Sequence, residues 1–319
     1  MDDKNRTSFG EQTTTDDVIA GIDLHGSTAV VTGASTGLGL ETARALASVG
    51  AHVVLSVRDA AKGTAALAAI RETEPGASVE FGILDLASLA NVRAFADDVR
   101  QRVATIDILV NNAGVMYTPY ERTVDGFEMQ FGTNHLGHFL LTNLLLPPVL
   151  AAAPARIVNL SSGGHRGSDI IWDDPNYERR PYDKFEAYGQ SKTANILFTV
   201  ELDRRFMSQG VRSYAVHPGM IATELSRHMT RDDMQELRAR ARSAPTRPGQ
   251  PGGLPSLKTI PAGAATSVWA ATAPELAATG GVYLADCQIA EASEYALSEA
   301  SASRLWAMSE DLVGQHFDR

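Results

Sequence analysis

The sequence Thr32-Gly33-Ala34-Ser35-Thr36-Gly37-Leu38-Gly39 joins a short β-branched run, Thr28–Thr32, to an alanine- and leucine-rich stretch that begins at Leu40. Glycines permit a tight turn and let backbone N–H groups approach a pyrophosphate, and the N-terminus of a following helix adds partial positive charge. The glycines stand at positions 33, 37 and 39, which differs from the G-x-G-x-x-G pattern. An ordinary strand–helix connection is the alternative, but the position after a first strand and before a helix favours a dinucleotide site.

The alternation of strand and helix continues along the chain. Ala/Leu-rich stretches with helical spacing, such as Leu40–Val49 and Leu89–Val103, separate short apolar runs. The predicted strands are Thr28–Thr32, His52–Val57, Val79–Leu84, Ile106–Val110, Arg156–Leu160, Arg212–Val216 and Gly281–Leu284. This order predicts an α/β, Rossmann-type doubly wound sheet of about seven parallel strands, in a single domain over residues 25–319.

Three segments depart from this alternation. Residues 1–24 are polar, show no secretory signal and are expected to form a flexible N-terminal arm. Two insertions follow strand ends, at about residues 163–187 and 224–261, and are expected to act as substrate lids. The second contains an Arg-rich helical piece, Arg231–Arg242, and a Pro/Gly-rich run, Pro245–Pro255. A disordered insert or a solvated charged face is the alternative for it.

Composition narrows the class of protein. The formal net charge of −10 argues against nucleic-acid binding through a general basic surface. The single cysteine, Cys287, rules out an internal disulfide, suits a reducing compartment and is expected to be a small buried residue. The apolar stretch Phe139–Leu150 is interrupted by two polar residues and two prolines and is predicted to be too short for a bilayer span. We therefore expect a cytoplasmic protein with a small-molecule substrate and no membrane partner.

Tyr188 and Lys192 lie four residues apart in a predicted helix, so their side chains share one helical face. A fixed positive charge lowers the pKa of a phenol from its usual value of about 10, which would let the pair act as an acid/base near neutral pH. A surface tyrosine and lysine without catalytic function are the alternative for this spacing alone.

Arg58 follows the second predicted strand, at the position where an acidic residue would accept the ribose hydroxyls of NAD. Val57 carries no carboxylate there, and Arg58 offers a cation for a 2′-phosphate. The pattern favours NADP over NAD as the cofactor. A solvated Arg58 with relaxed cofactor specificity is the alternative.

His135 and His138 lie three residues apart, so a metal site is one hypothesis for this pair. No further ligand follows at a suitable spacing, so structural packing is expected and no metal site is predicted. Mostly apolar or aromatic residues downstream of strand ends are candidates for the pocket wall and favour a hydrophobic or ring-containing substrate. They are Met116, Tyr117, His165, Trp172, Met220 and Leu225. For His165, a solvent-exposed loop position is the alternative.

Motifs after the later strands, together with the glycine turn, resemble the classical short-chain dehydrogenase/reductase superfamily over about residues 25–300. They are Asp85-Leu86, Asn111-Asn112-Ala113-Gly114 and His217-Pro218-Gly219. The runs 131–139 and 191–198 are similar to the retinol dehydrogenase-like branch, which often carries a membrane anchor that is not visible here. The long separation between Ser162 and Tyr188 indicates an elaborated substrate entrance.

The resemblance implies a catalytic tetrad of Asn134, Ser162, Tyr188 and Lys192. It also implies a cofactor-binding set, which consists of Gly33, Ser35, Thr36, Gly37, Leu38, Gly39, Arg58, Asp85, Leu86, Asn112, Ala113, Gly114, Tyr188, Lys192, Pro218, Gly219, Ile221 and Thr223. Ser161 is the alternative to Ser162, and bracing of its own helix is the alternative role for Asn134.

The implied reaction is reversible hydride transfer between NADP(H) and a carbonyl or secondary alcohol. Tyr188 would exchange a proton with the substrate oxygen, and Ser162 would hold that oxygen by a hydrogen bond. Lys192 would lower the pKa of Tyr188 and bond the nicotinamide ribose, and Asn134 would anchor a proton-relaying water.

Two other functions stay open on this scaffold, because fold does not dictate function. They are a catalytically silent NADP-binding sensor and an epimerase or dehydratase. The resemblance further implies homodimers or homotetramers, although monomers also occur among related proteins.

Overall fold

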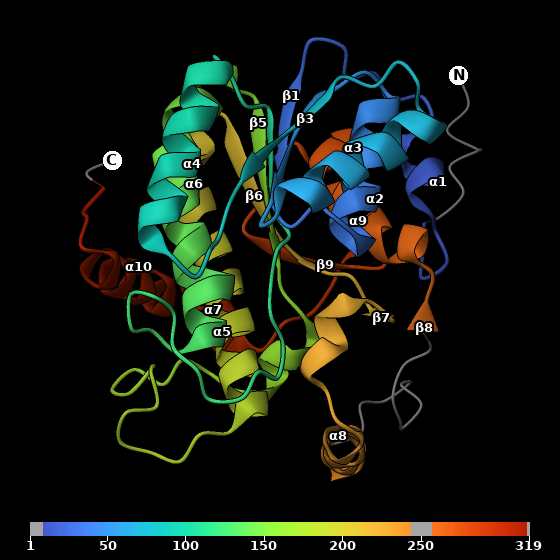
Figure 1. Ribbon diagram of the computed structural model, residues 1–319. Coiled ribbons are helices and arrows are strands. Elements are labelled where there is room, and N and C mark those ends of the chain that lie inside the picture. Colours follow the sequence, from blue (N-terminus) through green and yellow to red (C-terminus); the bar gives the residue numbers. More distant parts are fainter. Residues whose placement is uncertain (1–8, 244–256, 318–319) are drawn as a thin grey trace.

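A central sheet organises the computed structural model, which describes residues 9–243 and 257–317 (Figure 1). Its eight strands follow the order β10-β9-β6-β5-β4-β1-β2-β3. They are β1 (Thr28–Val31), β2 (His52–Val57), β3 (Val79–Ile83), β4 (Ile108–Asn111), β5 (Ala155–Leu160), β6 (Val211–His217), β9 (Val282–Ala285) and β10 (Gln288–Ile289). All neighbours from β3 to β9 pair in parallel, and β10 pairs antiparallel with β9. The predicted doubly wound sheet is confirmed, with an antiparallel edge strand added.

Helices cover both faces of this sheet (Figure 1). One layer consists of α2 (Gly37–Ser48), α3 (Ala60–Thr73) and α9 (Ile260–Thr272). The opposite layer consists of α4 (Leu89–Arg102), α6 (Gly137–Ala152) and α7 (Lys184–Phe206), and α10 (Glu299–Val313) packs outside α7. Shorter helical segments are α1 (Thr15–Ile19), α5 (Met129–Phe131), η1 (Gly132–Leu136), η2 (Gly163–Gly167), η3 (Met207–Gln209), η4 (Glu224–His228), η5 (Pro274–Leu276) and η6 (Glu294–Leu297).

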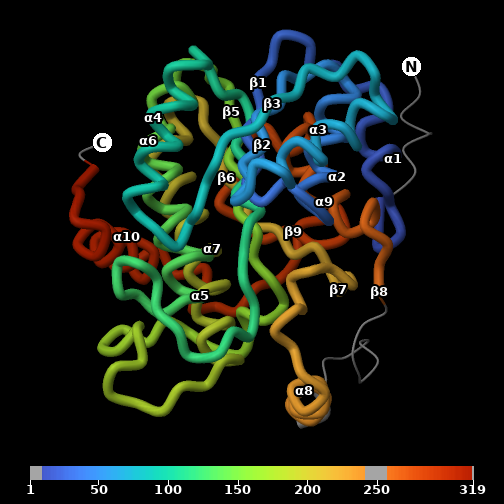
Figure 2. The backbone as a smooth tube through the Cα atoms, viewed as in Figure 1, coloured from blue at the N-terminus to red at the C-terminus, as the bar shows by residue number. Residues whose placement is uncertain are grey.

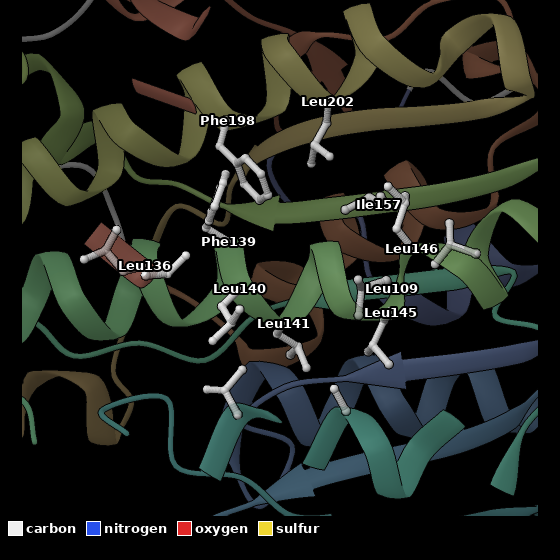
Figure 3. Close-up of a cluster of buried hydrophobic side chains, with 14 of the residues drawn as sticks. Leu109, Leu136, Phe139, Leu140, Leu141, Leu145, Leu146, Ile157, Phe198 and Leu202 are labelled. Carbon is white, nitrogen blue, oxygen red and sulfur yellow. The ribbon is translucent and has the colours of Figure 1, made fainter. Parts of the chain in front are cut away.

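The main core lies between the sheet and the layer of α4, α6 and α7 (Figure 3). Phe139 of α6 lies beside Phe198 of α7, and Leu146 of α6 lies near the sheet residues Leu109 and Ile157. Each such side chain contributes about 1.5–3 kcal/mol when it is fully removed from water. The central strands are apolar on both faces because helices cover both, which is typical of parallel sheets. This core holds the carboxyl ends of the strands in place.

The apolar helix of this layer is longer than the sequence indicated. Helical structure continues over Met129–Ala152, 24 residues, which is long and apolar enough to cross a membrane, and 72% of its most apolar part is buried inside the fold. The expectation that this stretch is too short was wrong, because Pro147 and Pro148 lie inside α6 without ending it. The Pro148 carbonyl accepts a hydrogen bond from the Ile106 amide at 3.0 Å, which ties the end of the helix to the segment just before β4.

Part of the segment expected to be a flexible arm is a packed helix. A capping box between Thr14 and Asp17 starts α1, and Val18 and Ile19 are buried in the second core cluster. Arg44 of α2 also forms an ion pair with Asp16 at 2.6 Å. The prediction of an arm is therefore wrong for α1, since its apolar face is buried against α2 and α9. Residues 1–8 lie outside the described residues.

The first insertion is anchored on α7. Gln190 is fully buried, accepts a hydrogen bond from the Ile171 amide at 2.9 Å and donates one to the Pro175 carbonyl at 3.0 Å. The insertion ends earlier than predicted, because Asp183 caps α7 and residues 184–187 belong to its first turn. The structure thus joins the insertion directly to the helix that carries Tyr188.

The second insertion contains η4 and a further helix, α8 (Arg231–Ser243), which confirms the predicted Arg-rich helical piece. Figure 2 traces the chain from β6 through β7 (Met220–Ile221) to α8, which lies away from the sheet. The strand β8 (Leu257–Lys258) pairs in parallel with β7, and α9 then begins at residue 260. The Pro/Gly-rich run Pro245–Pro255 lies outside the described residues.

Ion pairs connect α8 to the start of α7. Arg240 pairs with Asp183 at 2.7 Å, and Asp233 pairs with Lys184 at 2.6 Å. The Arg240 guanidinium also lies 4.6 Å from the ring centre of Phe185. Helix α8 is thereby held against the helix that carries Tyr188 and Lys192.

Candidate active site

A cavity of about 1010 Å³ lies at the carboxyl ends of the central strands. This is the edge at which ligands bind in open α/β sheets. Every residue of the predicted cofactor-binding set lines the cavity, from Gly33 in the first turn to Thr223 after β7. Three of the four predicted catalytic residues, Ser162, Tyr188 and Lys192, line it as well.

The backbone of the glycine turn lies close to neighbouring chain segments, as its sequence predicts. Gly33 has φ +65°, and a Cβ built on it would lie 2.8 Å from the Cα of Ala113. A Cβ on Gly39 would collide with the Gly33 carbonyl and with Asn112. The Asn112 side chain donates to the Thr32 carbonyl at 2.7 Å and fastens the turn to the end of β4. The cradle thus has room only for backbone, and with α2 beginning at Gly37 it suits a dinucleotide pyrophosphate.

Tyr188 is buried, and its ring lies 5.2 Å from that of Tyr117. Burial raises the pKa of Tyr188 to about 12, and a hydrogen bond with Ser162 opposes this rise. Lys192 donates from Nζ to the Leu160 carbonyl at 3.0 Å, and burial lowers the pKa of Lys192 to about 8. The predicted lowering of the Tyr188 pKa by Lys192 is thus not what the structure shows, because desolvation of the phenol is the largest effect.

The two neighbouring serines at the end of β5 have different environments. Ser161 is buried, and its hydroxyl donates to the Lys192 carbonyl at 2.9 Å, which ties β5 to α7. Ser162 accepts a hydrogen bond from the Gly164 amide at 3.1 Å and bonds Tyr188. The geometry therefore places Ser162 beside the phenol, as the resemblance implied, and gives Ser161 a bracing contact.

Asn134 lies behind the cavity and does not line it. Its side chain is fully buried in the π-helical turn η1, accepts from the Val115 amide at 2.8 Å and donates to the Val115 carbonyl at 2.9 Å and to Ser191 at 3.0 Å. A Cβ built on Gly114 would be 3.2 Å from Asn134 Oδ1 and 3.7 Å from Lys192 Nζ. Asn134 thus braces the loop after β4 close to Lys192, and its role as the anchor of a proton-relaying water stays a prediction.

His135 and His138 bond in different directions. His135 Nε2 lies 2.8 Å from the Ser309 hydroxyl of α10, whereas His138 Nε2 lies 2.9 Å from the Thr32 hydroxyl. Burial lowers the pKa of His135 to about 3 and that of His138 to about 4, so both rings are neutral at pH 7. Both histidines connect core elements by hydrogen bonds.

Two residues expected in the pocket wall lie elsewhere. His165 is fully buried, bonds the Ser162 carbonyl at 2.6 Å and accepts from the Ser293 amide at 3.2 Å, so it orders the loop after β5. Trp172 stacks against the guanidinium of Arg304 at 4.2 Å, at the first core cluster. Neither side chain therefore lines the cavity. The other four candidates, Met116, Tyr117, Met220 and Leu225, line it.

Cys287 is buried, as predicted, and burial raises the pKa of its thiol to about 11. Its amide donates to the Thr266 hydroxyl at 3.2 Å. The thiol is therefore protonated at neutral pH and serves as a packing group.

Further residues line the cavity that the sequence did not identify as candidates. Apolar residues from the helix before α6 and from the second insertion are Met129, Met229, Met234, Leu237 and Leu257, and the cationic residues are Lys62, Arg166 and Arg227. Met234 and Leu237 are three residues apart in the otherwise charged α8, which is a helical-face signal that could have been found. No sequence signal marked Arg227, because its position depends on how the second insertion folds back.

Comparison with known proteins agrees with this geometry. Residues 27–234 match the family model of the short chain dehydrogenase. The chain is 43% identical to human retinol dehydrogenase 12 over 293 residues, which cover 92% of this chain and 88% of that protein. It is 44% identical to human retinol dehydrogenase 13 over 291 residues, 91% of this chain and 86% of that protein.

Solved structures resemble the fold as well. An uncharacterised protein from Mycobacterium Paratuberculosis matches with a TM-score of 0.75 and 36% identity over 97% of this chain and 100% of that chain. The NADP complex of Pseudomonas aeruginosa RhlG matches with a TM-score of 0.62 and 27% identity over 82% of this chain and 95% of that chain. The chain therefore belongs to the short-chain dehydrogenase/reductase family, in its retinol dehydrogenase-like branch, and is an oxidoreductase that acts on alcohols or carbonyls with a nicotinamide dinucleotide.

Proposed function

We propose that this chain transfers a hydride reversibly between NADP(H) and an apolar carbonyl compound or secondary alcohol. The observation that carries the proposal is one shared cavity. The Tyr188 phenol and the Ser162 hydroxyl lie in the same space as the glycine turn and as an apolar, methionine-rich wall. An apolar pocket with a few polar groups is typical of a site that binds a hydrophobic small molecule.

The roles of the residues follow from their positions. The bound cofactor supplies or accepts the hydride. Tyr188 donates its proton to the carbonyl oxygen during reduction, and Ser162, which bonds Tyr188, holds the same oxygen as negative charge develops. The Lys192 ammonium, held by the Leu160 carbonyl, bonds the nicotinamide ribose and keeps positive charge beside the phenol. Burial excludes water and strengthens these electrostatic contacts.

Arg58 supports NADP as the cofactor. It follows β2 and lines the cavity together with Lys62, whereas Val57 at the same strand end has no carboxylate. A guanidinium bonds a phosphate in a bidentate manner, which NAD cannot exploit at its 2′-hydroxyl. The names of the relatives, retinol dehydrogenases, agree with an apolar alcohol as the substrate class.

A coenzyme-coupled screen tests the proposal. Purified protein is incubated with NADPH or NADH and with matched apolar and polar aldehydes and ketones, retinal included, and absorbance of the reduced ring is followed. We expect turnover of apolar compounds with NADPH and a loss of at least about 100-fold in Tyr188→Phe, with coenzyme affinity little changed. Turnover that persists in Tyr188→Phe would contradict the assigned role.

The same screen separates the alternative functions. A silent sensor would bind NADPH and turn over none of the compounds. An epimerase or dehydratase would retain its cofactor through the cycle, so net oxidation of NADPH in proportion to product argues against both alternatives. Equal use of NADH and NADPH would contradict the proposed cofactor preference.

A further inference from the structure

We propose that Arg227 is a second recognition residue for the 2′-phosphate of NADP(H), and that binding of this phosphate also fixes the neighbouring apolar residues that form the wall of the substrate pocket. The inference rests on the proposed use of NADP and deepens it. It assigns a role to a cation from the second insertion, on a segment far in sequence from Arg58.

The path of the chain brings Arg227 to the cofactor side of the cavity. The segment that carries it starts against the glycine turn, since the Thr223 methyl carbon is 3.6 Å from where a Cβ on Gly37 would lie. Thr223 then caps η4 by accepting from the Leu225 amide at 3.3 Å. Arg227 follows in η4 and lines the same cavity as Arg58.

Three of the cations that line this cavity come from separate segments: Arg58 from the end of β2, Lys62 from the first turn of α3, and Arg227 from η4. Burial lowers the pKa of Arg227, the nearby Arg58 guanidinium lowers it further, and the Glu224 carboxylate opposes both. Arg227 and Arg58 are therefore close enough to repel each other.

Asp59 and Glu224, the acidic residues next to these cations in the sequence, bond them only through backbone groups. Asp59 caps α3, where its carboxylate accepts from the Lys62 amide at 2.9 Å. Arg227 contacts Glu224 through the backbone carbonyl, to which its Nη1 donates at 3.2 Å. Within residues 9–243 and 257–317, no ion pair joins Arg58, Lys62 or Arg227 to a carboxylate.

A phosphate dianion between the two guanidiniums would replace their repulsion with charge-assisted hydrogen bonds on both sides. A hydrogen bond to a charged group contributes enough to change a dissociation constant by about tenfold or more. NAD(H) has a hydroxyl at this position and leaves the repulsion in place. Arg227 thus favours NADP(H) for the same reason as Arg58, because the 2′-phosphate pairs with a guanidinium and the 2′-hydroxyl does not. Arg227 does so from η4, whereas Arg58 does so from the end of β2.

The same segment forms part of the substrate wall. Leu225 and Met229 stand two residues to either side of Arg227, and both line the cavity. The Met229 amide donates to the Ser226 carbonyl at 2.9 Å, which joins Met229 to the short helical segment that carries Arg227. A 2′-phosphate that fixes Arg227 therefore also fixes Leu225 and Met229, which links cofactor identity to substrate affinity.

The test compares Arg227→Gln, Arg227→Lys and Arg58→Gln with a matched control, Arg231→Gln, which removes an exposed arginine at the start of α8 that does not line the cavity. Dissociation constants for NADPH and NADH are measured by fluorescence of the bound reduced ring at fixed ionic strength. KM for an apolar carbonyl is then measured with each coenzyme. Melting temperatures confirm that all variants are folded.

We expect Arg227→Gln to weaken NADPH binding by about tenfold while NADH binding changes less than about twofold. Arg227→Lys should recover part of the affinity, and Arg231→Gln should match the wild type. In the wild type the substrate KM should be lower with NADPH than with NADH, and this difference should disappear in Arg227→Gln.

Three failures are distinguishable. If Arg58→Gln removes the preference for NADPH and Arg227→Gln does not, Arg227 is no recognition residue and the proposed use of NADP stands. If the wild type binds NADH as tightly as NADPH, the proposed cofactor fails and the role of Arg227 fails with it. If affinity changes as expected while the difference in KM persists, the coupling is overturned.

Discussion

Lys192 Nζ lies 5.6 Å from the ring centre of Tyr188, and both side chains are almost completely removed from solvent, with 4% of each residue exposed. Burial acts on the two groups in opposite directions, because it disfavours the charged form of each. It raises the pKa of Tyr188 to about 12 and lowers that of Lys192 to about 8. At neutral pH the pair therefore holds a neutral phenol and an ammonium, which is the state needed to donate a proton to a carbonyl oxygen.

The first prediction concerns the pH dependence of carbonyl reduction. Since the pKa of Lys192 is lowered to about 8, the ammonium is present below this pH and is lost as pH rises through it. We expect kcat/KM for reduction to fall above about pH 8, while Tyr188 keeps its proton. Measurement of kcat/KM from about pH 6 to about pH 10 at constant ionic strength locates this limb.

Lys192→Arg is the matched variant, because a guanidinium keeps its charge throughout this range. Its basic limb should move to higher pH, even if the maximum rate is lower. A limb at the same pH in both proteins would show that another group controls the profile.

The second prediction concerns the wall formed by α8. Met234 lines the cavity, whereas the neighbouring Gln235 is exposed and does not. Met234→Trp adds volume inside the cavity, so we expect KM for a bulky apolar substrate to rise by about tenfold, with a smaller change for a short-chain ketone. Steady-state kinetics with both substrates measure the ratio.

Gln235→Trp places the same side chain on the solvent side of α8 and should leave both KM values unchanged. Equal effects of the two substitutions would mean that α8 does not form a wall in solution.

The third prediction concerns acid stability. Burial lowers the pKa of His135 to about 3, whereas an unfolded histidine titrates near about 6.5. The unfolded chain therefore binds more protons than the folded chain between these values, so the free energy of unfolding falls as pH drops through this range. His135→Phe removes this contribution, and we expect the drop in melting temperature between about pH 7 and about pH 5 to be smaller in the variant.

His316→Gln is the control, since the side chain of His316 is 69% exposed. It should reproduce the wild-type dependence on pH. A pH dependence of His135→Phe equal to that of the wild type would contradict a neutral, buried His135.

The fourth prediction concerns α10. Trp306 packs edge-on against Phe139 with ring centres 5.1 Å apart, and the Arg205 guanidinium lies 4.2 Å from the Trp306 ring centre. We expect Trp306→Ala to lower the free energy of unfolding by about 3–5 kcal/mol, because it leaves a large cavity between α10 and α7. Urea denaturation followed by circular dichroism measures the difference.

Trp306→Phe keeps an aromatic ring there and should be less damaging. A loss below about 1 kcal/mol in Trp306→Ala would indicate that α10 is detached in solution. Sedimentation velocity of the wild-type protein tests the predicted homodimer or homotetramer in the same preparation.

Much of the candidate site could be predicted because its residues occupy the ends of parallel strands. Gly33, Arg58, Asn112, Ser162 and Pro218 each follow a separate strand, and the carboxyl ends of parallel strands meet at one edge of the sheet. Local sequence patterns were therefore sufficient to predict which residues from distant parts of the chain lie together at this edge. The alternation of strands and helices determined the doubly wound sheet for the same reason, since apolar runs between amphipathic helices must be covered on both faces.

The rest depended on packing between distant segments, which no local pattern encodes. Hydrogen bonds to Val115 and Ser191 hold the Asn134 side chain behind the cavity. A hydrogen bond to Ser293 holds the His165 ring away from the cavity. The sequence by itself determined which chemical groups stand at the carboxyl edge of the sheet. Tertiary structure alone decided which of them are desolvated and which additional groups, such as Arg227, come near, because burial and long-range electrostatic contact arise only when the whole chain has folded.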